Sequence, residues 1–165
     1  MKPRHLALCG VFGAAALILP VFFHMLRLGS TFMPMYLPLV ALAFFVPSGV
    51  AALTALIVPP LSGAVTGMPP FYPPIAIVMA IELSLMTFLI STIRHKWPRL
   101  KPLPLLFAVL LFGRIFSACL YYLAALIYNL PPKFIAGISL LSGWPGIVMM
   151  LIVVPQIVRF TPPHE

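Results

Sequence analysis

The chain has 165 residues, of which 62% are apolar and only 7% are charged. Soluble domains carry about a quarter charged residues and disordered chains are polar, so this composition excludes both classes. A membrane helix needs about 20 residues, which leaves room for about six spans and no separate soluble domain. The whole chain, residues 1–165, is therefore predicted to form a single integral membrane domain in the lipid bilayer.

Ten basic residues stand against two acidic residues, which gives a net charge of +8. The basic residues lie mainly at the ends of apolar stretches, where Lys and Arg set the orientation of a membrane protein. A nucleic-acid-binding face would instead cluster them with polar neighbours on one folded surface. We therefore predict no nucleic-acid partner.

Apolar stretches in chain order predict an all-α membrane protein, a bundle of six transmembrane helices. They cover residues 6–26, 32–46, 49–65, 74–93, 103–128 and 134–158. The second and third are short and contain Pro34, Pro38, Pro59 and Pro60. Backbone groups freed by proline inside a membrane must find partners in the protein or in a wet cavity. Short, interrupted spans therefore indicate a binding site.

The placement of the basic residues predicts that both termini are cytoplasmic. With the N-terminus inside, six spans return the C-terminus to the same side, and seven basic residues then face the cytoplasm while two face outward. The inner set is Lys2, Arg4, Arg94, Lys96, Arg99, Lys101 and Arg159, and the outer set is Arg27 and Lys133.

The first span places Gly10 and Ala14 four residues apart, and the third span does the same with Ala51 and Ala55. Small residues at this spacing allow a second helix to approach closely, either within the molecule or in a partner. Both cysteines lie inside apolar runs, with no CxxC and no histidine at ligand spacing. Neither a disulfide framework nor a metal site is predicted.

The segment between the third and fourth spans, residues 66–74, contains four prolines and two aromatic residues. Such a segment is stiff and apolar. Its Met68, Phe71 and Tyr72 side chains can cap an outward-facing pocket. Alternatively, the segment is a rigid turn whose aromatic rings anchor helix ends at the membrane interface.

Glu82 and Arg114 lie near the middle of the fourth and fifth spans. A lone charge at that depth costs about 2.5–3.5 kcal/mol on insertion scales, so both charges require an explanation. Either they form a structural ion pair between the two spans, or one of them faces a ligand, with Arg114 suited to a carboxylate or phosphate.

Three polar or aromatic side chains lie toward the outer half of the fifth and sixth spans. They can line a pocket or belong to the aromatic belt at the membrane surface. These residues are Tyr121, Asn129 and Trp144.

Several catalytic motifs are missing from the sequence. It has no GxxxxGK[ST] phosphate loop, no HExxH and no GxSxG, and Glu165 is too remote to pair with Glu82. We therefore predict that the chain is not an enzyme and binds no catalytic cofactor.

Four segments together resemble the substrate-binding S components of energy-coupling factor (ECF) transporters. They are LPVFFH at residues 19–24, GSTFMPMYLP at 29–38, the stretch 61–70 with Glu82 after it, and Gly113-Arg114 combined with GWPGI at 143–147 and Val154-Pro155. The order and spacing of these segments cover nearly the whole chain. Two positions depart from the family pattern, because Tyr36 stands in place of a histidine and Met150 in place of a glutamine.

The resemblance implies a six-helix bundle that binds one vitamin or related precursor near the outer face, under loop residues. The loaded bundle would then associate with a transmembrane coupling subunit and two ATPase subunits in a prokaryotic plasma membrane. Gly10 and Ala14 take the place of the family's AxxxA docking motif. The implied lid residues are Met68, Phe71 and Tyr72, and the implied pocket or pocket-support residues are Tyr36, Glu82 and Arg114.

Two other functions share this composition and topology. One is a non-transporting scaffold similar to the small rod-shape-determining membrane proteins, which would bind protein partners and no small ligand. The other is a solitary vitamin carrier that works without ATPases.

Overall fold

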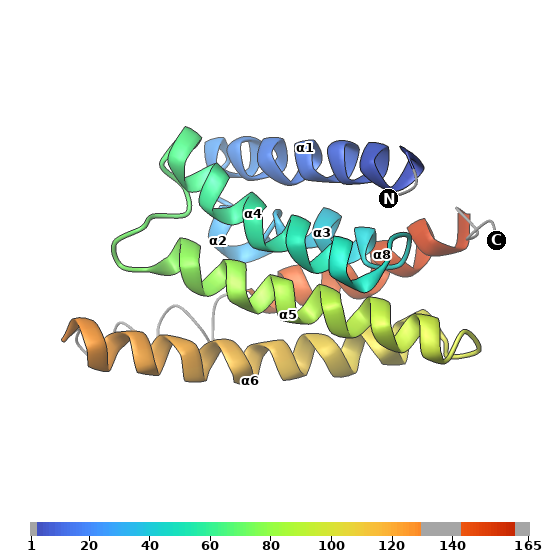
Figure 1. Ribbon diagram of the computed structural model, residues 1–165. Coiled ribbons are helices and arrows are strands. Elements are labelled where there is room, and N and C mark those ends of the chain that lie inside the picture. The colour runs from blue at the N-terminus through green and yellow to red at the C-terminus, as the bar shows by residue number, and fades with distance from the viewer. Residues whose placement is uncertain (1–2, 130–142, 161–165) are drawn as a thin grey trace.

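The computed structural model describes residues 3–129 and 143–160, and every regular element in these ranges is a helix (Figure 1). Four helices are long and apolar enough to cross a membrane, as expected for a multi-pass membrane protein. They are α1 (Pro3–Met25), α4 (Ser48–Thr66), α5 (Ile75–Lys96) and α6 (Pro102–Tyr128). Shorter helices are α2 (Gly29–Phe32), α3 (Tyr36–Leu42) and the apolar α8 (Trp144–Phe160).

The first, third, fourth and fifth predicted spans correspond to α1, α4, α5 and α6, with ends that differ by three residues or fewer. Only the second half of the sixth predicted span, α8, falls within the described residues. Residues 134–142 of that prediction lie outside them.

The second predicted span, residues 32–46, is not one continuous helix. Helix α2 ends at Phe32; its C-cap residue, Met33, has a left-handed φ of 46°, and Pro34 follows directly. Helix α3 then has seven residues, which is about 10 Å of rise and far less than the hydrocarbon thickness. The chain therefore advances through this region as two short helices and a turn.

This interrupted segment forms the centre of the molecule. Its residues Leu39, Val40, Ala41 and Leu42 are completely buried, and helices α1, α5 and α8 pack around them. Beyond α3, the carbonyl oxygen of Val46 accepts a hydrogen bond of 2.8 Å from the Ser91 hydroxyl on α5. The Ser91 side chain of a neighbouring helix thus provides a hydrogen-bond partner for a backbone carbonyl group beyond the end of α3.

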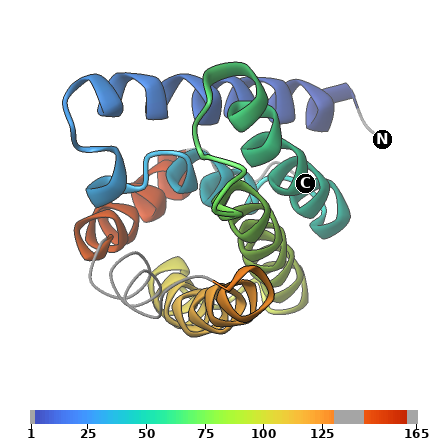
Figure 2. The same cartoon turned by 90° about the vertical axis from the view of Figure 1, so that its left-hand side faces the viewer.

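Helices α4, α5 and α6 form two consecutive antiparallel hairpins, and α1 packs against α4 and the α2–α3 segment on the side away from α6 (Figures 1 and 2). Ala51 and Ala55 of α4 are buried, so these small residues serve packing within the molecule. Helix α1 is the least buried of the long helices, with Gly13 and Ala16 alone fully buried on it.

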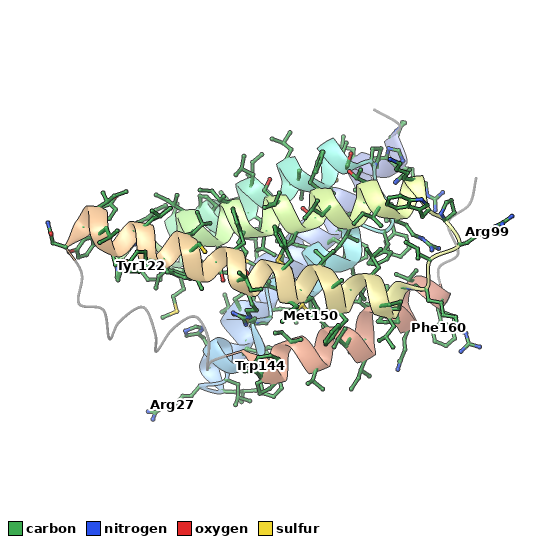
Figure 3. All side chains as sticks on the ribbon, turned by 90° about the horizontal axis from the view of Figure 1, so that it is seen from below. Arg27, Arg99, Tyr122, Trp144, Met150 and Phe160 are labelled. Carbon is green, nitrogen blue, oxygen red and sulfur yellow. The ribbon has the colours of Figure 1, made fainter. Side chains whose placement is uncertain are left out.

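The two ends of the bundle differ in charge. The start of α1, the turn between α5 and α6 and the end of α8 lie at one end, which we call the basic end (Figure 1). The basic residues on these segments are Arg4, Arg94, Lys96, Arg99, Lys101 and Arg159. The end of α1, the 67–74 loop and the end of α6 lie at the opposite end; Figure 3 shows Arg99 near the basic end and Arg27 toward the other.

Candidate functional site

A cavity of about 360 Å³ lies at the end opposite the basic end. Its walls come from the close of α1, the α2–α3 junction, the 67–74 loop, α5 and α6. Most of the lining is apolar and includes four methionines, Met33, Met35, Met68 and Met79. A small number of polar groups in an otherwise apolar cavity is typical of a small-molecule site, and this volume lies near the lower end of the usual range.

Glu82 on α5 and Tyr36 at the start of α3 form the central polar contact of this cavity. The Tyr36 hydroxyl donates a hydrogen bond of 2.6 Å to a carboxylate oxygen of Glu82. Both side chains are at least 97% buried. The distance is that of a charge-assisted O–H···O⁻ bond, so the pair is a strong link between the interrupted segment and α5.

Arg114 on α6 joins three parts of the chain at the cavity wall. Its Nη2 atom donates to the sulfur of Met33, the C-cap residue of α2, at 2.7 Å. Gly143, directly before α8, lies against both side chains: a Cβ atom there would overlap the guanidinium and come within 2.8 Å of the sulfur. The φ of Gly143 is +111°, a conformation that favours glycine. Glycine is thus required at the contact between the start of α8 and Arg114.

The opposite charges of Glu82 and Arg114 interact electrostatically, and both residues line the cavity. Tyr121, two turns after Arg114 on the same helix face, lines it as well. The cavity floor therefore combines one carboxylate, one guanidinium and two phenol rings, which together offer donors and acceptors to a bound molecule.

The 67–74 loop is fastened to α4 through Met68. The Met68 carbonyl oxygen accepts hydrogen bonds from Ser62 at 2.7 Å and from Thr66 at 3.1 Å. Gly67 ends α4 in a left-handed conformation with φ of 75°, which turns the chain toward the cavity. Met68, Pro69 and Pro70 then line the cavity.

Five of the nine residues predicted from the sequence come together at this cavity: Tyr36, Met68, Glu82, Arg114 and Tyr121. The other four are not among its described lining residues. The Phe71 ring packs over Gly63 of α4, and the Tyr72 ring meets Tyr128 of α6 edge-on with centroids 6.2 Å apart. Both rings therefore brace the loop against neighbouring helices.

Asn129 and Trp144 also have positions away from the cavity lining. Asn129 ends α6 in a left-handed conformation, and its backbone N–H donates to the Ala125 carbonyl. Trp144 is the first residue of α8 and half of its surface is exposed (Figure 3). Met150, which stands in place of a glutamine, is 1% exposed and packs in the core of the bundle.

Gly10 and Ala14, the predicted docking residues, lie on the exposed face of α1. The buried face of that helix instead carries Gly13 and Ala16. A Cβ atom added to Gly13 would lie 3.9 Å from the side chain of Val58 on α4. The small residues of α1 thus occur on both faces, one against α4 and one open.

Sequence reasoning missed several lining residues, for which two signals exist. Ile75 and Met79 precede Glu82 by seven and three residues, so helical spacing places them on the same face. Met33, Pro34 and Met35 belong to the GSTFMPMYLP segment, in which Pro34 was singled out as an interruption of the span. Within residues 3–129 and 143–160, no three His, Cys, Asp or Glu side chains gather to hold a metal ion.

Comparisons with known proteins give no match: no protein-family model, no curated protein and no solved structure is significantly similar to this chain.

Proposed function

We propose that this chain is the substrate-binding S component of an ECF-type transporter, which binds a vitamin or related micronutrient for uptake. The observation that supports this most is the cavity with the Glu82–Tyr36 pair and Arg114 in its wall, inside an apolar helix bundle. Ionisable groups within a membrane protein are expensive and usually mark a substrate pathway. The resemblance of the sequence motifs to S components supplies the transport role.

The proposal includes six membrane crossings with both termini in the cytoplasm. Helices α2 and α3 with the following turn make the second crossing, and the segment that ends with α8 makes the sixth. The location of the basic end supports this orientation, because positively charged segments remain on the cytoplasmic side. The cavity then faces outward, where a nutrient arrives.

The exposed face of α1 that carries Gly10 and Ala14 is the proposed docking surface for the transmembrane coupling subunit, which acts with two ATPase subunits. Ala14→Leu should abolish co-purification with the coupling subunit, because the added side chain prevents close helix approach. Ala64→Leu, on the exposed face of α4, is the matched control and should leave co-purification unchanged.

Native mass spectrometry of the detergent-purified chain tests substrate binding. We expect a stoichiometric adduct of small-molecule mass whose occupancy falls in Arg114→Gln and is unchanged in Arg159→Gln, a control at the exposed C-terminal end of α8. A bare protein that stays bare after incubation with vitamins and precursors would overturn the proposal and favour the membrane scaffold. Uptake by the chain alone in liposomes, without ATPases, would identify a solitary carrier.

A further inference from the structure

The charged groups in the cavity wall constrain the charge of what the cavity can hold. Among the described lining residues, the charged side chains are Glu82 and Arg114, one negative and one positive. They are 2% and 9% exposed, and their charges attract each other. The imidazole of His24 also lines the cavity, but this residue is exposed at the end of α1. The buried part of the wall therefore holds one group of each sign, which is a balance of charge.

A charged ligand would upset this balance. Moving an ion out of water into a low-dielectric site is costly unless a counter-charge and hydrogen bonds compensate it. Here the two buried groups of opposite sign attract each other, and the Tyr36 hydroxyl donates to Glu82. A ligand without net charge avoids the penalty and can still use the carboxylate, the guanidinium and the Tyr121 hydroxyl as hydrogen-bond partners.

The rest of the lining favours a flat ring. Four thioether side chains (Met33, Met35, Met68 and Met79) surround the space together with proline rings. Methionine sulfur makes favourable contacts with aromatic rings, and its flexible side chain adapts to their outline. The volume of about 360 Å³ suits a compact molecule rather than an extended one.

We infer that the ligand is a compact heteroaromatic molecule with no net charge at neutral pH, held with its polar edge toward Glu82, Arg114 and Tyr121 and its ring among the methionines. This inference rests on the proposed function and narrows its substrate class.

Three probes with the same ring and different charge test it: nicotinamide (neutral), nicotinate (anion) and 1-methylnicotinamide (cation). Each is titrated calorimetrically into the full-length chain in neutral detergent. We expect nicotinamide to bind about tenfold more tightly or better than either ion. Glu82→Gln leaves the wall positive and should shift the preference to nicotinate, while Arg114→Gln leaves it negative and should shift the preference to 1-methylnicotinamide.

The double variant Glu82→Gln/Arg114→Gln separates charge from structural damage, because it restores a neutral wall and should restore the preference for nicotinamide. Stronger binding of either ion to the unmodified chain would overturn the inference and leave the proposed function standing. The same holds if the molecule that co-purifies with the chain proves by mass to be an ion at neutral pH. If no probe binds and nothing co-purifies, the proposed function itself fails, and the inference fails with it.

Discussion

At the scale of single residues, the buried carboxylate of Glu82 dominates the energetics of the cavity. It is 2% exposed in an apolar helix bundle, and the Tyr36 hydroxyl at 2.6 Å is a donor that offsets its lost hydration. Removing one partner of a buried polar pair costs the full desolvation penalty of the group left behind. Tyr36 is thus a support for Glu82 as well as a part of the wall.

Tyr36→Phe should therefore lower the free energy of unfolding by about 1–3 kcal/mol, since the ring is kept and only the donor is lost. Thermal unfolding in one detergent measures the effect. Tyr122→Phe is the control, because Tyr122 is 58% exposed on the outer side of α6 (Figure 3). Equal melting temperatures for the two variants would contradict the role assigned to the Tyr36 hydroxyl.

Gly143→Ala should be strongly destabilising for two independent reasons. Its φ of +111° costs a non-glycine residue about 1–3 kcal/mol, and the new Cβ atom would overlap the Arg114 guanidinium. Gly49→Ala is the matched control, because a Cβ atom at Gly49 meets nothing within 4 Å. Thermal unfolding should separate the two variants clearly; a neutral Gly143→Ala would argue against the described contact.

At the scale of elements, the close of α4 positions the 67–74 loop over the cavity. Ser62 is completely buried and donates to the Met68 carbonyl, while the Phe71 and Tyr72 rings pack on α4 and α6. The loop is thus held at both its beginning and its middle. Met68 has a backbone carbonyl that is hydrogen-bonded to α4, and it also lines the cavity.

Ser62→Ala should loosen this loop without unfolding the bundle. The lost hydrogen bond is worth about 1 kcal/mol, so amide hydrogen exchange over residues 67–75 should accelerate roughly fivefold. Thr54→Ala is the control, because the Thr54 hydroxyl bonds only to the Val50 carbonyl of its own helix in the described structure. Unchanged exchange in Ser62→Ala would show that the aromatic contacts alone hold the loop.

At the scale of the whole molecule, the separation of charge along the bundle sets its proposed orientation. With Cys9 and Cys119 replaced by alanine, single cysteines at positions 99 and 71 should react with a membrane-impermeant maleimide from opposite sides. Intact cells should label Phe71→Cys, and inverted vesicles should label Arg99→Cys. The reverse pattern would place the cavity toward the cytoplasm and contradict uptake from outside.

Much of this architecture could be predicted from the sequence, because long apolar runs in a membrane have no alternative to helix. Glu82 and Arg114 were recognisable because a charge inside an apolar run is conspicuous. The directions in which the Phe71 and Tyr72 rings point could not be predicted, since they depend on where Gly63 and Tyr128 lie in the folded chain. Pro34 indicated an interruption of the helix near Met33. The left-handed conformation of Met33 could not be predicted, because its contact with Arg114 joins helices that are distant in sequence.

The interrupted segment that contains α2 and α3 also has a consequence for the order in which the protein is made. Helix α1, which contains an 18-residue window with a mean hydropathy of 2.4, can leave the translocation channel for lipid on its own. Residues 29–47 cannot, because Tyr36 and Val46 find their partners on α5, and Met33 finds its partner on α6. Those helices emerge from the ribosome later. Nascent chains that end before residue 75 should therefore hold this segment at the membrane surface, and its burial should await α5 and α6.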